Sequence, residues 1–470
     1  NFNFLSKKIS RGDQMKDKFL KDQQRKLAIG SIDRRQFISS AVAAGVVLPT
    51  AMTMATQALA APNKGGHVKL ALGHGSTTDT LDPATFENGW SNMVGYMIRN
   101  HLTEVGSDGQ LRGELAESYE SSDGKTWIFH LRKGVEFHNG KSLTQDDVIA
   151  SLQHHMGEDS QSAAKGLLTA VESMTKDGSN SIKIVLKSPN ADFPFIVSDY
   201  HLAICPESGG KINPTDGIGT GYMVLDRFDP GVVGTGTRNP NWWKPEGYFD
   251  SAEVLSIIDP TARQTAVMNG DVNIIDRLAP NTVALMSKNP NLNIQQVTGT
   301  LHYTFPMRLN VEPFDNYDLR MALKLAIKRQ ELVDKILLGY GALGNDHPIS
   351  TANRFHASEL PQREFDPEKA AEHYKKSGHS GTIQLSASDA AFAGAVDAAQ
   401  LIANSAKECG MDIEVVREPK DGYWSNVWNL KGWCACYWGG RPTEDWMFSA
   451  AYTNDTEWND TAWKGTESSK

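Results

Sequence analysis

Cysteine is scarce in this sequence, which has four in 470 residues. An exported fold that depends on disulfides carries many more. Cys434 and Cys436 are too close in sequence for an unstrained bridge, and no second cysteine pair or nearby histidine completes a zinc site with them. A bridge from either of them to Cys205 or Cys409 stays open.

Positive charge is also in short supply. Lysine and arginine number 47 against 56 aspartates and glutamates, which gives a formal net charge of −9. A nucleic-acid partner is therefore not expected, because a phosphate backbone needs a basic face. Beyond the N-terminal region no apolar run approaches the roughly 20 residues that cross a bilayer, so a soluble mature protein is expected.

Catalytic motifs are missing as well. The sequence has no GxSxG, HExxH or phosphate-binding loop, and no histidine stands next to Cys434 or Cys436. His154-His155 and the other histidines do not have the spacing of metal ligands. We therefore expect a protein that is not an enzyme and that holds no cofactor and no metal. A secreted hydrolase whose histidine approaches only in space stays open.

Residues 1–60 have the composition of an export signal. A basic stretch (16–35) contains Arg34-Arg35 and precedes a weakly apolar run (41–59), which predicts cleavage after Ala60. The paired arginines resemble a twin-arginine signal, which implies export to the periplasm in the folded state. We expect translation to begin at Met15. An uncleaved membrane anchor is the alternative, although polar residues dilute the run.

A strand and a turn are predicted within residues 115–152. Trp127, Phe129 and Leu131 recur at the two-residue period of a strand. Asn139-Gly140 follows, and these are the residue types that adopt a positive φ at low cost, so a turn is expected there.

A helix should follow that turn. Thr144 with Asp147 three residues later is a capping pattern in front of an apolar run. Its buried side is expected to carry Val148, Ile149, Leu152 and Met156. By themselves these patterns predict only a strand, a turn and a helix.

The same stretch closely resembles the hallmark segment of the family 5 extracytoplasmic solute-binding proteins, the dipeptide, oligopeptide and nickel receptors of ABC importers. The letters AES, FHLRKGVEFHNG and LTQDDVIASL all match its pattern. A second segment, LNVEPFDNYDLRMALKLAIKRQELVDKILLGYG (309–341), also follows the family. The resemblance covers about residues 62–452.

The resemblance implies an α/β fold: the two-lobed periplasmic binding protein fold, type II and cluster C-like, with an extra small domain inserted in the first lobe. A chain of 470 residues is also too long for one compact core. The expected parts are a signal region (1–60), lobe I (61–87 and 212–304), the small domain (88–211), lobe II (305–455) and a tail (456–470). Relatives return to lobe I at their C-termini, so we expect that return to be missing here.

The resemblance also points to residues 432–452 as the ligand site. Peptide-binding members have a tryptophan and then Ala-Asp-Tyr, whose aspartate pairs with the α-ammonium of the peptide. Trp433 and Tyr437 match this pattern, but Cys436 stands in the place of the aspartate. The cysteine in place of the aspartate therefore argues against an ordinary peptide held by its N-terminus.

Charged and aromatic residues just beyond this motif are candidates for replacing the aspartate. Arg441 could bind a carboxylate with two hydrogen bonds, while Glu444 and Asp445 could take a cation, which together predict a zwitterionic ligand. The alternative is that Arg441 pairs locally with Asp445 and that the nearby tryptophans are core. The expected ligand-binding residues are Trp433, Cys436, Tyr437, Trp438, Arg441, Glu444, Asp445, Phe86 and Trp90. Phe86 and Trp90 could equally be core.

The function implied by the resemblance is that of a periplasmic substrate-binding protein of an ABC importer. It would capture a short peptide or an amino-acid-derived solute between its lobes and deliver it to the permease subunits in the membrane. A receptor for an opine, an oligosaccharide or a nickel complex is the alternative. We expect a monomer.

Overall fold

The chain divides into two units in the computed structural model: Asn1–His67 with Glu246–Asp250, and Val68–Pro245 with Ser251–Lys470. The structure describes residues 19–20, 23, 26, 32–59, 64–107, 109–297, 299–454 and 456–464. The predicted start at Met15, the predicted cleavage after Ala60 and residues 465–470 of the predicted tail fall outside these residues.

Two helices, α2 (Arg34–Ala43) and α3 (Leu48–Leu59), form most of the described part of the first unit. Asp33 caps α2, because its carboxylate accepts the backbone N–H of Gln36 at 2.8 Å. Small apolar side chains of both helices pack together with Phe37. The apolar run after the paired arginines is thus split between two helices. Among the residues described, no helix combines the length and the apolar character that spanning a membrane requires.

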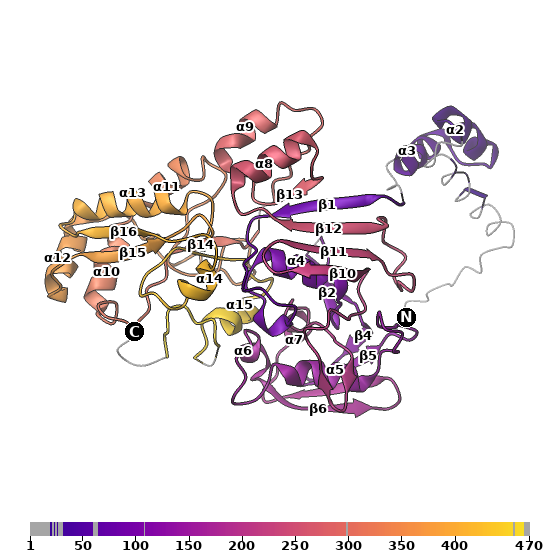
Figure 1. Ribbon diagram of the computed structural model, residues 1–470, viewed down its shortest axis with the longest axis horizontal. Helices are drawn as coiled ribbons and strands as arrows, with labels where there is room; N and C mark the ends of the chain where they lie inside the picture. The colour runs from indigo at the N-terminus through magenta and orange to yellow at the C-terminus, as the bar shows by residue number, and fades with distance from the viewer. Residues whose placement is uncertain are drawn as a thin grey trace, which may run out of the picture. The chain divides into compact units, whose positions relative to one another are not determined.

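A five-stranded sheet in the order β10-β11-β12-β1-β13 begins the second unit (Figure 1). Its strands are β1 (His67–Leu72), β10 (Met223–Asp229), β11 (Val233–Arg238), β12 (Ser251–Ser256) and β13 (Ile274–Ile275). β10, β11 and β12 pair antiparallel, whereas β1 and β13 pair parallel. Three helices accompany this part: α4 (Gly89–Ile98), α8 (Pro260–Asn269) and α9 (Val283–Met286).

The residues between β1 and β10 build a second sheet, in the order β4-β5-β7-β6. Its strands are β4 (Ala116–Glu120), β5 (Thr126–Leu131), β6 (Val171–Asp177) and β7 (Ser181–Leu186), joined by α5 (Gln145–His154), α6 (Lys165–Leu168) and α7 (Phe193–Ile196). Two short hairpins flank it: β2 (Thr103–Val105) with β3 (Leu111–Gly113), and β8 (Glu207–Ser208) with β9 (Lys211–Ile212).

Local predictions for the hallmark segment are confirmed here. Trp127, Phe129 and Leu131 of β5 are all buried. Gly140 has φ of 83°, as the predicted turn requires. The predicted apolar face is buried or packs against the same core; Val148, Ile149 and Leu152 lie on α5, and Met156 lies just beyond its end.

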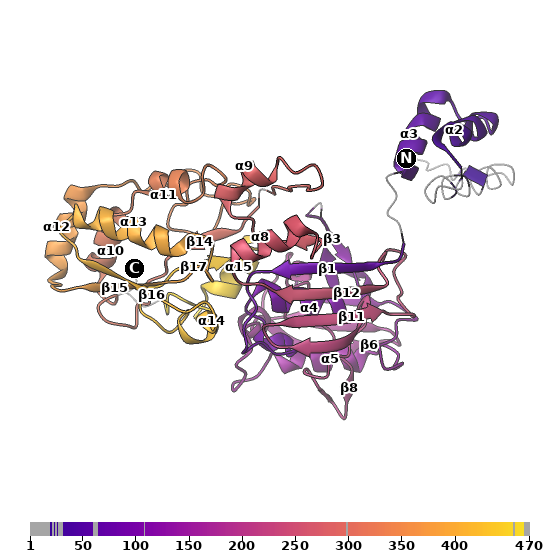
Figure 2. The same cartoon turned by 45° about the horizontal axis from the view of Figure 1, so that its top comes forward.

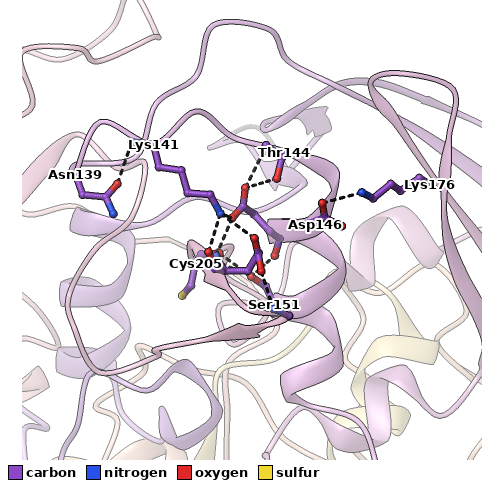
Figure 3. Close-up of polar contacts among 10 residues, drawn as sticks. Asn139, Lys141, Thr144, Asp146, Ser151, Lys176 and Cys205 are labelled. Carbon is purple, nitrogen blue, oxygen red and sulfur yellow. Dashed lines mark hydrogen bonds and ion pairs between the residues drawn. The ribbon is translucent and has the colours of Figure 1, made fainter.

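Asp147, in the first turn of α5, is buried and is the centre of a polar network. Figure 3 shows its partners Lys141 and Thr144. Its Oδ2 accepts the backbone N–H of Thr144 at 2.8 Å and the hydroxyl at 2.7 Å. Its Oδ1 accepts the ammonium group of Lys141 and the backbone N–H of Glu207. Ser151, one turn further along α5, donates to the carbonyl of Cys205 at 3.2 Å. The helix start is thereby tied to a segment about 60 residues away in sequence.

The remaining chain forms a third α/β part, in which β15 (Ile383–Ala387) and β16 (Ile413–Arg417) pair parallel and α13 (Ala395–Lys407) lies alongside them (Figure 2). β14 (His302–Thr304) pairs antiparallel with β17 (Cys436–Trp438). The other helices are α10 (Tyr317–Leu325), α11 (Arg329–Lys335), α12 (Pro367–Ser377), α14 (Tyr423–Asn426) and α15 (Glu444–Ala451).

Helix α15 follows the third α/β part in sequence but packs against the small β4-β5-β7-β6 sheet. Its residues Trp446 and Ala450 belong to the hydrophobic core of the small β4-β5-β7-β6 sheet. Gly166 of α6 lies close against this region, because a Cβ there would meet the carbonyl oxygen of Ser449 at 2.8 Å. The domain boundaries given by the sequence remain a prediction.

Candidate functional site

A cavity of about 1330 Å³ lies in the second unit. One part of its wall follows the five-stranded sheet and includes His74, Arg263 and Arg277. Another part comes from the third α/β part and includes Tyr303 and Phe392. Segments far apart in sequence therefore meet around one space large enough for a small solute.

His74 and Arg277 come together because two parallel strands end side by side. β1 ends at Leu72 and β13 at Ile275, so the residues that follow them lie at the same edge of the sheet. Open α/β sheets bind ligands at the carboxyl ends of their strands.

The ring of Tyr437 lies against both of these side chains. Its centroid is 5.2 Å from that of His74, with the two rings nearly parallel at 24°. The guanidinium carbon of Arg277 lies 3.9 Å from the centroid of the same ring, a cation–π contact. Trp424 meets Tyr437 edge-on at 5.2 Å. Tyr437 thus joins the third α/β part to the edge of the five-stranded sheet.

Asp276 lies next to both arginines at this edge. Asp276 lies 3.4 Å from Arg263 and 3.7 Å from Arg277, and its Oδ1 accepts the backbone N–H of Gly73. Burial raises the pKa of Asp276, and the two guanidinium groups oppose that shift. One carboxylate therefore faces two arginines.

Another part of the wall is aromatic. Tyr303 and Phe392 stack with centroids 4.1 Å apart and planes at 10°. Asp389 also lines the cavity, and its Oδ1 is buried and has no hydrogen-bond partner in the part of the chain that the structure describes. Buried polar groups without partners cost free energy, and at a binding site a ligand satisfies them.

The predicted residues in β17 and just before it do not all face the cavity. Trp433 lines the cavity and its indole donates to the Phe305 carbonyl at 3.0 Å, while Tyr437 contacts His74 and Arg277. Cys436 and Trp438 flank Tyr437 and are buried. Successive strand residues point to opposite faces, so these two side chains leave the face that Tyr437 occupies. The four cysteines are all free and buried.

Asp460 lies on the Trp438 side of β17 and accepts the indole N–H groups of Trp428 and Trp438 at 3.2 and 3.1 Å. Burial raises its pKa from 3.8 to about 6, although these hydrogen bonds oppose the shift. Between these two values the folded chain binds more protons at this site than the unfolded chain does. Its contribution to stability is therefore largest below pH 4 and is lost as pH rises through about 6.

Asp460→Asn should remove this dependence. The difference in unfolding free energy between the variant and the wild type should shift in favour of the variant by up to about 1.4 kcal/mol per pH unit between pH 4 and 6, and level off above that. Urea unfolding at pH 4, 5, 6 and 7 measures it. Parallel pH profiles for the two proteins would contradict the assignment.

Arg441 and Asp445 do not pair with each other. Arg441 is buried, and its Nε lies 3.5 Å from Asp199 Oδ2. Asp445 accepts from the amide of Asn190 at 2.8 Å, and Glu444 accepts the backbone N–H of Phe355 at 2.7 Å. These charged groups hold the start of α15 in place, which the sequence did not reveal because their partners lie far away along the chain.

Phe86 and Trp90 lie in the core rather than at the cavity described above. Trp90 is fully buried, and its indole donates to the Val254 carbonyl of β12 at 3.0 Å. Phe86 packs closely against Gly95 of α4. The reason is local: Asn88 caps α4 and so directs Trp90 at the sheet.

Sequence reasoning missed His74, Arg277, Tyr303 and Phe392. His74 and Arg277 follow the ends of β1 and β13, and no pattern in the sequence showed that these two strands are neighbours.

The comparisons with known proteins agree with this architecture. Residues 110–460 match the model of the bacterial extracellular solute-binding proteins, family 5 Middle. The chain belongs to this family.

Two curated relatives are similar over much of the chain. Di/tripeptide-binding protein 1 of Pseudomonas aeruginosa (strain UCBPP-PA14) is 26% identical over 329 residues, covering 63% of this chain and 61% of the relative. Glutathione-binding protein GsiB of Escherichia coli O6:K15:H31 is 28% identical over 348 residues, covering 73% and 66%. The chain thus matches less than two thirds of the length of these relatives.

Among solved structures, the periplasmic binding protein DppA of Helicobacter pylori, in complex with the peptide STSA, has a TM-score of 0.78 at 20% identity. The match covers 86% of this chain and 85% of that one. The predicted fold class, a two-lobed α/β periplasmic binding protein fold, is confirmed.

Proposed function

We propose that this protein is the substrate-binding protein of an ABC importer. It captures a short peptide or an amino-acid-derived solute in the cavity and delivers it to the permease subunits in the membrane. It acts as a monomer and catalyses no reaction. The observation that carries this proposal is the cavity itself, where Tyr437 meets His74 and Arg277 and where Tyr303 stacks on Phe392.

Aromatic and polar groups contribute different contacts to the solute. The stacked pair of Tyr303 and Phe392 supplies apolar contact, as in most small-molecule sites. Trp433 and Tyr437 contact the solute, as the sequence predicts. The proposed domain division is the one drawn from the sequence, with the cavity between lobes I and II. A solute that contacts both lobes stabilises their closed arrangement, which the permease then recognises.

Export by the twin-arginine route to the periplasm completes the proposal. Its support is the order of features in the first unit, with Arg34 and Arg35 at the start of α2 and a weakly apolar region after them.

Native mass spectrometry of the exported protein, purified without denaturation, tests the proposed function. The expected result is a discrete added mass that unfolding releases. A pool of di- and tripeptides should also raise the free energy of unfolding, by about 2.7 kcal/mol when the free concentration of the peptide that binds is 100 times its Kd.

Tyr437→Ala serves as the site variant and should abolish most of that stabilisation, while Tyr437→Phe, which keeps the ring against His74 and Arg277, is the conservative control. Peptides recovered intact support a receptor, whereas cleaved peptides would point to a hydrolase. Stabilisation by opines or oligosaccharides and not by peptides would overturn the proposed solute class.

A further inference from the structure

A row of polar contacts joins the turn after β1 to residues 420–425, which lead from β16 into α14. The backbone N–H and the hydroxyl of Thr77 donate to the carboxylate of Asp421 at 3.3 and 3.2 Å. Next to this pair, the hydroxyls of Thr78 and Ser425 lie 2.9 Å apart. The region of the five-stranded sheet and the third α/β part are therefore held together by their own side chains.

An ion pair adds a further contact between the same two regions. Lys420 Nζ lies 3.4 Å from a carboxylate oxygen of Asp259, which precedes α8. These contacts together are named the seam, with Thr77, Thr78 and Asp259 on one side and Lys420, Asp421 and Ser425 on the other.

The seam follows the edge of the cavity and lies outside it. His74 lines the cavity and precedes Thr77 by three residues. Ile258 and Pro260 also line it and stand on either side of Asp259. In the part of the chain that the structure describes, no seam residue is among those that line the cavity. The seam is therefore close to the site without touching a solute held there.

One side of the seam is a preformed turn. Asp79 accepts the backbone N–H of Ser76 at 2.7 Å and the side-chain amide of Asn88 at 2.6 Å. Asn88 also caps α4. The turn that presents Thr77 and Thr78 is thereby fixed to the region of the five-stranded sheet.

The contacts across the seam are polar and accessible to water. All seam residues except Lys420 are exposed, and 31% of the Lys420 side chain is accessible. Exposed ion pairs and hydrogen bonds each contribute little, because water replaces them when they break. Several of them in a row hold two regions together and still separate at a small cost in free energy.

We propose that the seam is a latch that holds the cavity closed over a bound solute. This inference rests on the proposed function and adds the contacts that set how long the closed form lasts. A latch that does not touch the solute stabilises the closed form equally for every solute. It should therefore lengthen the residence of each solute by the same factor and select none of them.

A cysteine pair across the seam provides the first test. The four natural cysteines are buried, so an oxidant should react with Thr78→Cys and Ser425→Cys in the folded double variant. The cross-link should form, and the cross-linked protein should release a bound pool of di- and tripeptides at least about 10-fold more slowly than the same protein after reduction. Native mass spectrometry after buffer exchange measures the release.

A second test needs no solute. Lys420→Ala in the double-cysteine protein should lower the rate of cross-linking about 2- to 5-fold, because the closed form loses an ion pair. Lys431→Ala is the matched control, since its pair with Glu418 at 3.2 Å lies within the third α/β part. Asp259 is left unchanged because it caps α8.

A third test uses the cysteine-free seam. Asp421→Ala removes the acceptor of Thr77 and should speed the release of every bound peptide by the same factor, about 3- to 10-fold. Asp412→Ala is its control, because Asp412 accepts from the Thr382 hydroxyl at 2.8 Å within the third α/β part. Thermal unfolding checks that all variants fold.

The outcomes separate the two proposals. A folded double-cysteine protein that forms no cross-link, or equal release before and after reduction, would overturn the latch and leave the proposed function standing. Factors that differ from peptide to peptide would overturn it too, because the seam would then contact the solute. If no peptide binds, the proposed solute class fails, and equal cross-linking rates in the Lys420→Ala and Lys431→Ala proteins would overturn the latch separately.

Discussion

Replacing Asp147 by alanine should lower the free energy of unfolding by about 3–5 kcal/mol. The side chain is fully buried and accepts from the Lys141 ammonium group, the Glu207 backbone and both donors of Thr144. Without it, Lys141 loses its main counter-charge and two backbone N–H groups lose their acceptor, so the loss exceeds that of an ordinary helix cap. Urea unfolding followed by circular dichroism measures the change.

Asp146→Ala is a matched control one residue away. Asp146 pairs with Lys176 at 2.7 Å, but about half of each side chain is exposed, so this substitution should cost less than about 1 kcal/mol. If the two variants lost similar amounts of unfolding free energy, Asp147 would act only through its charge in the first turn of α5.

Asp199→Ala should have an effect of similar size, about 3–5 kcal/mol, for a different reason. Asp199 is buried, with His201 Nδ1 at 2.5 Å, the indole nitrogen of Trp446 at 2.9 Å and Arg441 Nε at 3.5 Å. Burial alone would raise the pKa of Asp199, but the charges of His201 and Arg441 outweigh it and hold the pKa far below the ordinary range. Removing the carboxylate leaves Arg441 buried without its counter-charge.

The ring of His201 lies between two acceptors in this arrangement. Its Nε2 lies 2.8 Å from the Phe86 carbonyl, which only accepts, and its Nδ1 faces the carboxylate of Asp199. Asp199→Ala therefore also removes the partner of His201 Nδ1.

Asp445→Ala provides the comparison for Asp199. It lies on the same helix start as Trp446, but it is exposed and its partner is the neutral Asn190. A loss of less than about 1 kcal/mol in thermal or urea unfolding is expected. If Asp199→Ala were as mild as Asp445→Ala, the buried charges would have to find water or other partners in the variant.

Prediction from sequence succeeded where the determining interactions are local. The alternation of Trp127, Phe129 and Leu131, the glycine turn and the capping pattern of Thr144 with Asp147 each depend on neighbours within a few residues. The resemblance then supplied the fold, which no local pattern could have given.

The site was harder to predict because its contacts are distant in sequence. His74 and Arg277 are 203 positions apart and meet only because β1 and β13 pair. Arg441 and Asp445 looked like ligand groups because they stand among tryptophans, yet their partners Asp199 and Asn190 belong to another part of the chain. Strand alternation separates Tyr437 from its neighbours, but only tertiary packing decides which face meets the cavity.

The position of α15 has a consequence for how this architecture can change in evolution. Trp446 and Ala450 complete a core whose other members come from a segment more than 200 residues earlier. A recombination event that replaced the small domain alone would leave a foreign surface against this helix. The two regions are therefore expected to be inherited together, while the aromatic and charged residues around the cavity remain free to diverge.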